Sequence, residues 1–176
     1  MAGAAARRHA QAAFQIALER EEMDVWREDL GRLAEAVRDP GLRAFLESPR
    51  IHLDDKAGVL GRVLDKLNPV VMNIALLLIS RGRLGLLPET VTEFGRLVDE
   101  HRGIAHAEVA TAVPLDSKQE GKLAHRLSDI MGKDIVLTTE VEPSLIGGLT
   151  ARVGDKLIDG SIKSRFYALR GSLIKR

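Results

Sequence analysis

The side chains that could carry out chemistry in this 176-residue chain include five histidines and many carboxylates, but no cysteine. The histidines are His9, His52, His101, His106 and His125. None of them has the spacing to a second histidine or a carboxylate that suits a metal, so we predict surface or capping roles and no metal site. The lack of cysteine excludes disulfides, thiolate catalysis and cysteine-based metal sites.

Phosphate binding and hydrolysis are not indicated either. The glycines at positions 147, 148, 154 and 160 do not form the G-x-x-x-x-G-K-[S/T] pattern of a phosphate loop, and turns, a bulge and a helix start explain them. Adjacent acids such as Asp54-Asp55 are typical of helix starts, and no Ser-His-Asp group can be assembled. We therefore predict a noncatalytic protein with no cofactor.

A β-hairpin and a basic helix are predicted near the C-terminus. Apolar residues alternate over 149–153, and Gly154-Asp155 has the glycine that favours a two-residue hairpin turn into 156–158. Asp159 is placed to cap a helix that begins near Gly160. The basic residues of this helix are Lys163, Arg165, Arg170, Lys175 and Arg176.

Helical periodicity dominates the chain up to Gly103. A short third helix is expected over 42–47, and Asp54 or Asp55 can cap the fourth. Pro69 is well placed as the first residue of a fifth helix, and Leu87-Pro88 opens a sixth. Six helices with short connections predict a helical bundle domain over residues 1–103.

After Gly103 the hydrophobic period changes from helix to strand. Residues 105–113 alternate as a strand does, and 135–141 do so again. Between them, Ser117 and Glu120 have the spacing of a capping box at the start of a helix. With the hairpin and the last helix, residues 104–176 predict a small α+β domain with two helices and about four strands. The fold class is therefore α+β: an N-terminal six-helix bundle followed by a small α/β C-terminal unit.

Charge and hydropathy narrow the class of protein further. The net charge is +1, so the chain lacks the overall basic field of a nonspecific nucleic-acid binder. The longest apolar run, 74–79, has six residues, far fewer than the roughly 20 of a membrane span. No apolar segment follows Arg7-Arg8 as in a secretory signal, and we expect a cytoplasmic location.

Three motifs in order along the chain resemble one family. They are 6–14, with His9 where the family commonly has Tyr; 73–84 followed by Leu87-Pro88; and 141–173. Together they resemble the δ subunit of the bacterial F-type ATP synthase, the counterpart of the mitochondrial oligomycin-sensitivity-conferring protein. The resemblance implies a stator that joins the catalytic head to the peripheral stalk at the cytoplasmic face of the cell membrane.

The resemblance also implies where the partners bind. Between Val70 and Ile79 only Asn73 is polar, so this helix is either enclosed by its own bundle or partly open as a groove for a partner helix. In the family, the first and fifth helices receive the N-terminal helix of an α subunit. The corresponding candidates here are His9, Ala12, Ala13, Ile16, Asn73 and Leu77.

The other partner that the resemblance implies is the C-terminal region of the stalk b subunit. The candidates for this contact are Lys163, Arg165 and Arg170, although a solvated face on a structural helix would explain their charges equally well. Two other classes remain open at this stage. One is an RNA-binding protein like the helical antitermination factors, which also open with an Arg-Arg helix; the other is a small hydrolase, which needs a nucleophile that the patterns do not show.

Overall fold

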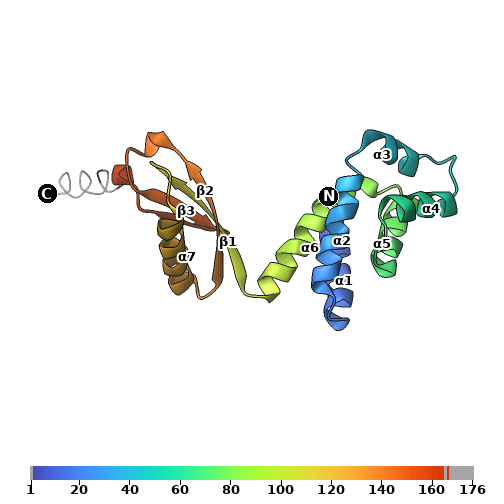
Figure 1. Cartoon of the computed structure of the whole chain (residues 1–176), viewed down its shortest axis with the longest axis horizontal. Helices are drawn as coiled ribbons and strands as arrows, with labels where there is room; N and C mark the ends of the chain where they lie inside the picture. Colours follow the sequence, from blue (N-terminus) through green and yellow to red (C-terminus); the bar gives the residue numbers. More distant parts are fainter. Residues whose placement is uncertain (1, 165, 167–176) are drawn as a thin grey trace. The chain divides into compact units, whose positions relative to one another are not determined.

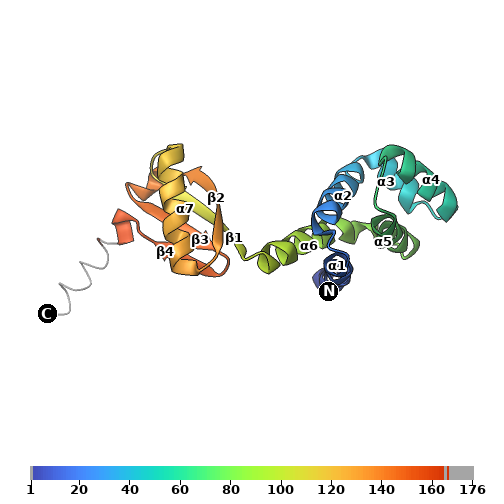
Figure 2. The ribbon, with the colours of Figure 1, turned by 60° about the horizontal axis from the view of Figure 1, so that its bottom comes forward.

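The computed structural model describes residues 2–164 and residue 166. Its contacts divide the chain into two compact units, which meet in the sequence between Val98 and Asp99. This division falls inside a helix, a little before the change of period at Gly103. The two units are described separately below, and Figures 1 and 2 show the elements of each.

The described part of the first unit is helical throughout. Its elements are α1 (Ala2–Glu19), α2 (Met23–Ala36), α3 (Pro40–Glu47), α4 (Leu53–Val63), α5 (Pro69–Ser80), the 3-10 turn η1 (Leu84–Leu86) and α6 (Leu87–His101). The predicted starts of α5 at Pro69 and of α6 at Leu87 are confirmed. Proline suits the first turn because the amide hydrogen that it lacks would have no partner in the helix.

Two helix starts of the first unit differ from the sequence expectation by a few residues. α3 begins at Pro40 because the Asp39 side chain accepts a hydrogen bond from the Leu42 backbone nitrogen at 2.7 Å. His52, not an aspartate, is the N-cap residue of α4, and its side chain makes no capping bond. Asp54 and Asp55 lie in the first turn, where their negative charges stabilise the helix by interacting with its dipole.

Two buried clusters hold the first unit together, and α5 contributes to both. In one cluster Trp26 stacks on Phe94, and Phe14 meets the same ring edge-on, both with ring centroids 6.4 Å apart. Trp26 is completely buried, so it is a core residue. The other cluster consists of Leu33, Val37, Leu46, Leu60, Leu64, Ala75, Leu78, Ile79, Leu84 and Leu87.

The second unit is a four-stranded sheet with a helix on one face. Its elements are β1 (Ile104–Thr111), α7 (Ser117–Met131), β2 (Asp134–Val141), the 3-10 turn η2 (Pro143–Leu145), β3 (Leu149–Val153) and β4 (Lys156–Asp159). The strand order is β2-β1-β3-β4. β1 and β2 are parallel and joined by α7, whereas β3 is antiparallel to both β1 and β4. The α+β class is confirmed, and so is the hairpin between β3 and β4.

The core of the second unit lies between α7 and one face of the sheet (Figure 2). It consists of Ala107, Val109, Leu127, Ala151 and Val153. The capping box of α7 is real but begins one residue earlier than expected. Asp116 is the N-cap, and it exchanges hydrogen bonds with Gln119 at 2.7 and 3.0 Å.

Gly147 and Gly148 lie against the chain that follows β4. Gly148 has a φ of +84°, and a Cβ on it would stand 2.5 Å from the Gly160 carbonyl oxygen. The Ile162 backbone nitrogen donates to the Gly147 carbonyl oxygen at 3.0 Å. Asp159 caps the turn that follows, because its carboxylate accepts from the Ser161 backbone nitrogen and the Ser164 hydroxyl. The hydrogen bond from Ser164 contributes most, and those from Ser161 next, to holding the pKa of the Asp159 carboxyl group below its usual value.

We expect Gly148→Ala to destabilise the second unit by about 2 kcal/mol or more, because the new methyl group meets backbone and the φ is strained. Gly121→Ala is the matched control. It lies inside α7 with open space around it, so it should be neutral or stabilise the helix by about 0.5–1 kcal/mol. Native-state hydrogen exchange of the β1 and β3 amides measures the stability change in each of the two variants. Equal protection in the two variants would contradict this account.

Candidate partner-binding surfaces

The predicted second face of α1 is partly exposed. Ala12 is exposed, and His9 and Ile16 are half-buried beside the core stripe. Ala13 differs, because only 1% of it is exposed and it belongs to the core cluster of Trp26. Its methyl group therefore lies beneath this surface instead of forming part of it.

α5 is not enclosed on all sides by the described residues of its own unit. Val71, Ala75 and Leu78 are buried, whereas Asn73 is exposed and Leu77 is 47% exposed. Asn73 and Leu77 are one helical turn apart, so they lie on the same outward stripe of the helix. The exposed Leu77 side chain leaves apolar area at the surface, which is one feature of a surface that binds a helix.

The structure brings His9 of α1 and Leu77 of α5 together. Both line a pocket of about 210 Å³, which Leu78, Arg81 and Arg83 complete. Ile16 and Ile74, from the same two helices, pack on the same core cluster. His9 and Leu77 therefore lie on one surface of the first unit, called the α1–α5 surface below, although they are far apart in the sequence. Helical spacing places Ala12 and Ile16 on the side of α1 that carries His9, and Asn73 on the side of α5 that carries Leu77.

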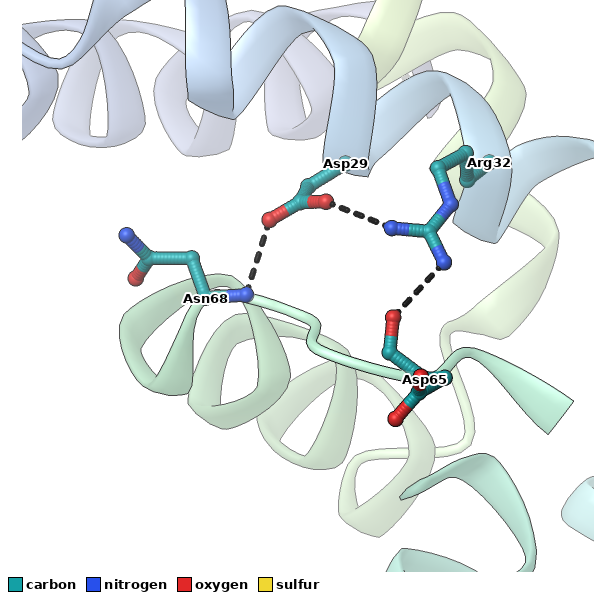
Figure 3. Close-up of polar contacts among 4 residues, drawn as sticks. All are labelled: Asp29, Arg32, Asp65 and Asn68. Carbon is teal, nitrogen blue, oxygen red and sulfur yellow. Dashed lines mark hydrogen bonds and ion pairs between the residues drawn. The ribbon is translucent and has the colours of Figure 1, made fainter. Parts of the chain in front are cut away.

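A polar network fixes the start of α5 against α2 (Figure 3). The Asp29 carboxylate, on a residue only 4% exposed, accepts from the Asn68 backbone nitrogen at 2.7 Å and from Arg32 at 3.2 Å. Arg32 also donates to the Asp65 carbonyl oxygen at 2.8 Å. Because this network sets where α5 begins, it also positions the exposed stripe of that helix.

Asn68 connects this network to the aromatic core. Its side-chain oxygen caps α5 by accepting from the Val70 backbone nitrogen at 2.9 Å, and its side-chain nitrogen donates to Glu22 at 3.1 Å. The Trp26 indole nitrogen donates to the same Glu22 oxygen at 3.2 Å. Sequence reasoning missed this network. The available signal was the Asn-Pro pair before an apolar helix, which predicts the cap but not its partners on α2.

The predicted stalk-binding residues fall at the end of the described chain. Lys163 is exposed, whereas Arg165 and Arg170 lie outside the described residues. Near Lys163 the surface is apolar, because Ile146, Ile162 and Phe166 are each more than 40% exposed. This end of the second unit therefore presents exposed apolar side chains as well as the charge of Lys163.

The face of the sheet opposite α7 has a hollow of about 400 Å³. Its lining includes Glu108, Arg152 and Leu157, with Glu108 and Arg152 opposite each other on β1 and β3. The lining combines both signs of charge with an exposed leucine, a mixture that does not point to one ligand chemistry.

Several ionisable groups of the described residues contact other side chains of their own unit. No group of three or more His, Cys, Asp or Glu among them could hold a metal ion. His106 lies 2.8 Å from Asp99, at the junction of α6 and β1. Hydrogen bonds from Arg96 lower the pKa of Glu93 on the surface of α6. None of the described helices is both long and apolar enough to span a membrane.

The described residues thus form a protein of two units: a helical one, in which α1 and α5 share a pocket, and a small four-stranded sheet packed on α7. The sequence profile of the ATP synthase delta (OSCP) subunit family matches residues 5–173. The chain belongs to this family, which is a noncatalytic subunit of the F-type ATP synthase. The hydrolase and antitermination alternatives are thereby set aside.

Curated relatives cover nearly the whole chain. It is 38% identical over 170 residues to the ATP synthase subunit delta of Dehalococcoides mccartyi, with 97% of this chain and 94% of that protein covered. It is 37% identical to the corresponding subunit of Heliobacterium modesticaldum, with 99% and 96% covered. A chain in the Toxoplasma gondii mitochondrial ATP synthase hexamer has the same fold, with a TM-score of 0.64, 22% identity, and 96% and 97% covered.

We expect Asp29→Ala to lower the free energy of unfolding of the first unit by about 1–3 kcal/mol, because it removes the acceptor of the part-buried Asn68 amide. Glu35→Ala is the control. It removes the Glu35–Arg38 pair, whose side chains are over 70% exposed, and should cost less than about 0.5 kcal/mol. Urea unfolding followed by the fluorescence of the single tryptophan, Trp26, measures both. Equal losses would show that the network does not stabilise α5.

Proposed function

We propose that this chain is the noncatalytic stator subunit that joins the catalytic head of the F-type ATP synthase to its peripheral stalk. The first unit binds the N-terminal helix of an α subunit, and the second binds the C-terminal region of the b subunit. By holding both, the chain stops the head from turning with the rotor. It works at the cytoplasmic face of the cell membrane, as part of the complex.

The α1–α5 surface is the observation that carries this proposal. Leu77 is an aliphatic side chain almost half exposed, and Ala12 is small enough to let a second helix approach closely. An amphipathic helix laid over this surface would remove Leu77 and Ile16 from water, which favours binding by about 25 cal/mol per Å² of apolar area. The proposed contacts are His9, Ala12, Ile16, Asn73 and Leu77, with Ala13 beneath them.

The proposed contact with the b subunit involves Lys163, Arg165 and Arg170. It is supported by the basic composition of the C-terminal end and by the exposed apolar residues beside Lys163. Basic side chains around an apolar patch suit a partner that is both acidic and amphipathic. We also propose that residues 1–103 and 104–176 fold as separate domains, a six-helix bundle and a small α+β domain, so that each can bind its own partner.

We expect Leu77→Asp to weaken binding of the α-subunit N-terminal helix by about tenfold to a hundredfold, because it replaces the apolar contact by a carboxylate that loses its water when the helix docks. Val63→Asp is a matched control, since Val63 is similarly exposed, at 53%, but lies on α4. Titration of the full chain with a synthetic peptide of that helix, followed by calorimetry, measures both. Equal affinity for wild type and Leu77→Asp would remove the groove from the interface.

Ala13→Glu is not a suitable test of the same interface. Ala13 is 1% exposed within the core cluster, so a glutamate there would disrupt the packing of α1 before it affected a partner. A loss of binding in that variant would report on folding.

For the stalk contact, we expect a Lys163→Gln, Arg165→Gln, Arg170→Gln variant to bind a soluble C-terminal fragment of the b subunit about tenfold more weakly, with a smaller dependence on salt. Lys118→Gln, Lys122→Gln, Arg126→Gln on α7 is the control, because it removes the same charge from exposed positions elsewhere on the second unit. Surface plasmon resonance at several salt concentrations measures both. Identical behaviour would show that the basic residues at this end are incidental.

A further inference from the structure

A basic pocket lies on the α1–α5 surface where α5 ends. α5 ends at Ser80, and the chain turns at Gly82, whose φ is +61°. The turn places Arg81 and Arg83 around the pocket of about 210 Å³ that His9 and Leu77 also line. Of its five lining residues, three are basic, two are leucines and none is acidic.

The charges of this pocket have no partner among the described residues. Arg81 and Arg83 are exposed, and neither their side chains nor that of His9 makes a hydrogen bond or ion pair with any residue that the structure describes. Other arginines of the first unit do pair with carboxylates. Arg32, Arg38 and Arg43 are examples, at 3.2, 3.0 and 3.1 Å.

Stabilisation of α5 by its own arginines does not explain this arrangement. A cation near a helix C-terminus gains about 0.3–1 kcal/mol from the helix dipole wherever it lies around the last turn. It does not need a second arginine and a histidine from another helix beside it. Their convergence at one pocket fits an anion, and arginine suits a carboxylate because its planar group can donate two parallel hydrogen bonds.

We propose that the pocket binds a carboxylate side chain of the helix that docks on the α1–α5 surface, and that this contact sets the register of that helix. This inference rests on the proposed function. Leu77 and Arg81 are one helical turn apart, so the partner should carry an aspartate or glutamate within about one turn of the apolar residue that covers Leu77. With apolar contacts alone, the partner helix could shift along the surface or bind in the opposite direction. A charge pair at one end disfavours the shifted register and the reversed direction.

The test is a titration of the full chain with a synthetic peptide of the α-subunit N-terminal helix. Arg81→Gln, Arg83→Gln should weaken binding by about tenfold or more and reduce its salt dependence. Arg50→Gln, Arg62→Gln is the matched control, because both arginines are exposed, line no part of this pocket and carry the same charge. It should change the affinity by less than about threefold. Circular dichroism melting confirms that each variant is folded.

A double-mutant cycle identifies the carboxylate. Each aspartate and glutamate of the peptide is replaced in turn by asparagine or glutamine. One replacement should weaken binding to the wild-type chain by about tenfold but not weaken binding to the Arg81→Gln, Arg83→Gln variant any further. If no acidic position of the peptide couples to the arginines, the inference is wrong.

The outcomes for the pocket and for the groove are separable. A peptide that binds, is weakened by Leu77→Asp and is indifferent to the arginines leaves the docking proposal standing and overturns the basic pocket. A peptide that fails to bind the wild-type chain at all overturns the proposed function itself.

Discussion

The first unit depends on one constraint, which is that α5 is apolar around nearly its whole circumference. Its buried side brings together two clusters, one around Trp26 and Phe94 and the other around Leu78 and Leu84. Helices of this kind are stable only where neighbours cover most of their surface. Here the described neighbours leave Leu77 almost half exposed. The same property that builds the core therefore leaves an apolar stripe on the surface.

The position of that stripe is set by polar contacts. Asp29 and Asn68 hold the start of α5 against α2, and Glu22 links Asn68 to the buried indole of Trp26. Buried polar groups are costly unless every one has a partner, so such a network permits few alternative positions of the helix. A surface that must bind tightly benefits from this rigidity, because less conformational entropy is lost on binding.

The second unit is stabilised by a small core between one helix and one face of its sheet. Among the described residues of this unit, α7 is the helix that covers one face of the four-stranded sheet, and the core there is small. Close backbone contact at Gly148 and the cap at Asp159 tie the end of the sheet to the residues that follow it. A binding surface at this end would thus be attached to the sheet through backbone, with few side chains between them.

The sequence by itself determined the order and type of the elements. Periodicity and turn residues were sufficient to predict α5 from Pro69, the hairpin at Gly154-Asp155 and the α+β class, because these depend on local conformational preference. Only the tertiary structure decided which apolar residues are core and which are surface. It buried Ala13 beneath its stripe, left Leu77 exposed, joined Asp29 to Asn68 by a hydrogen bond, and brought His9 and Arg81 to one pocket. Those relations depend on how helices distant in sequence pack together, and no local pattern encodes them.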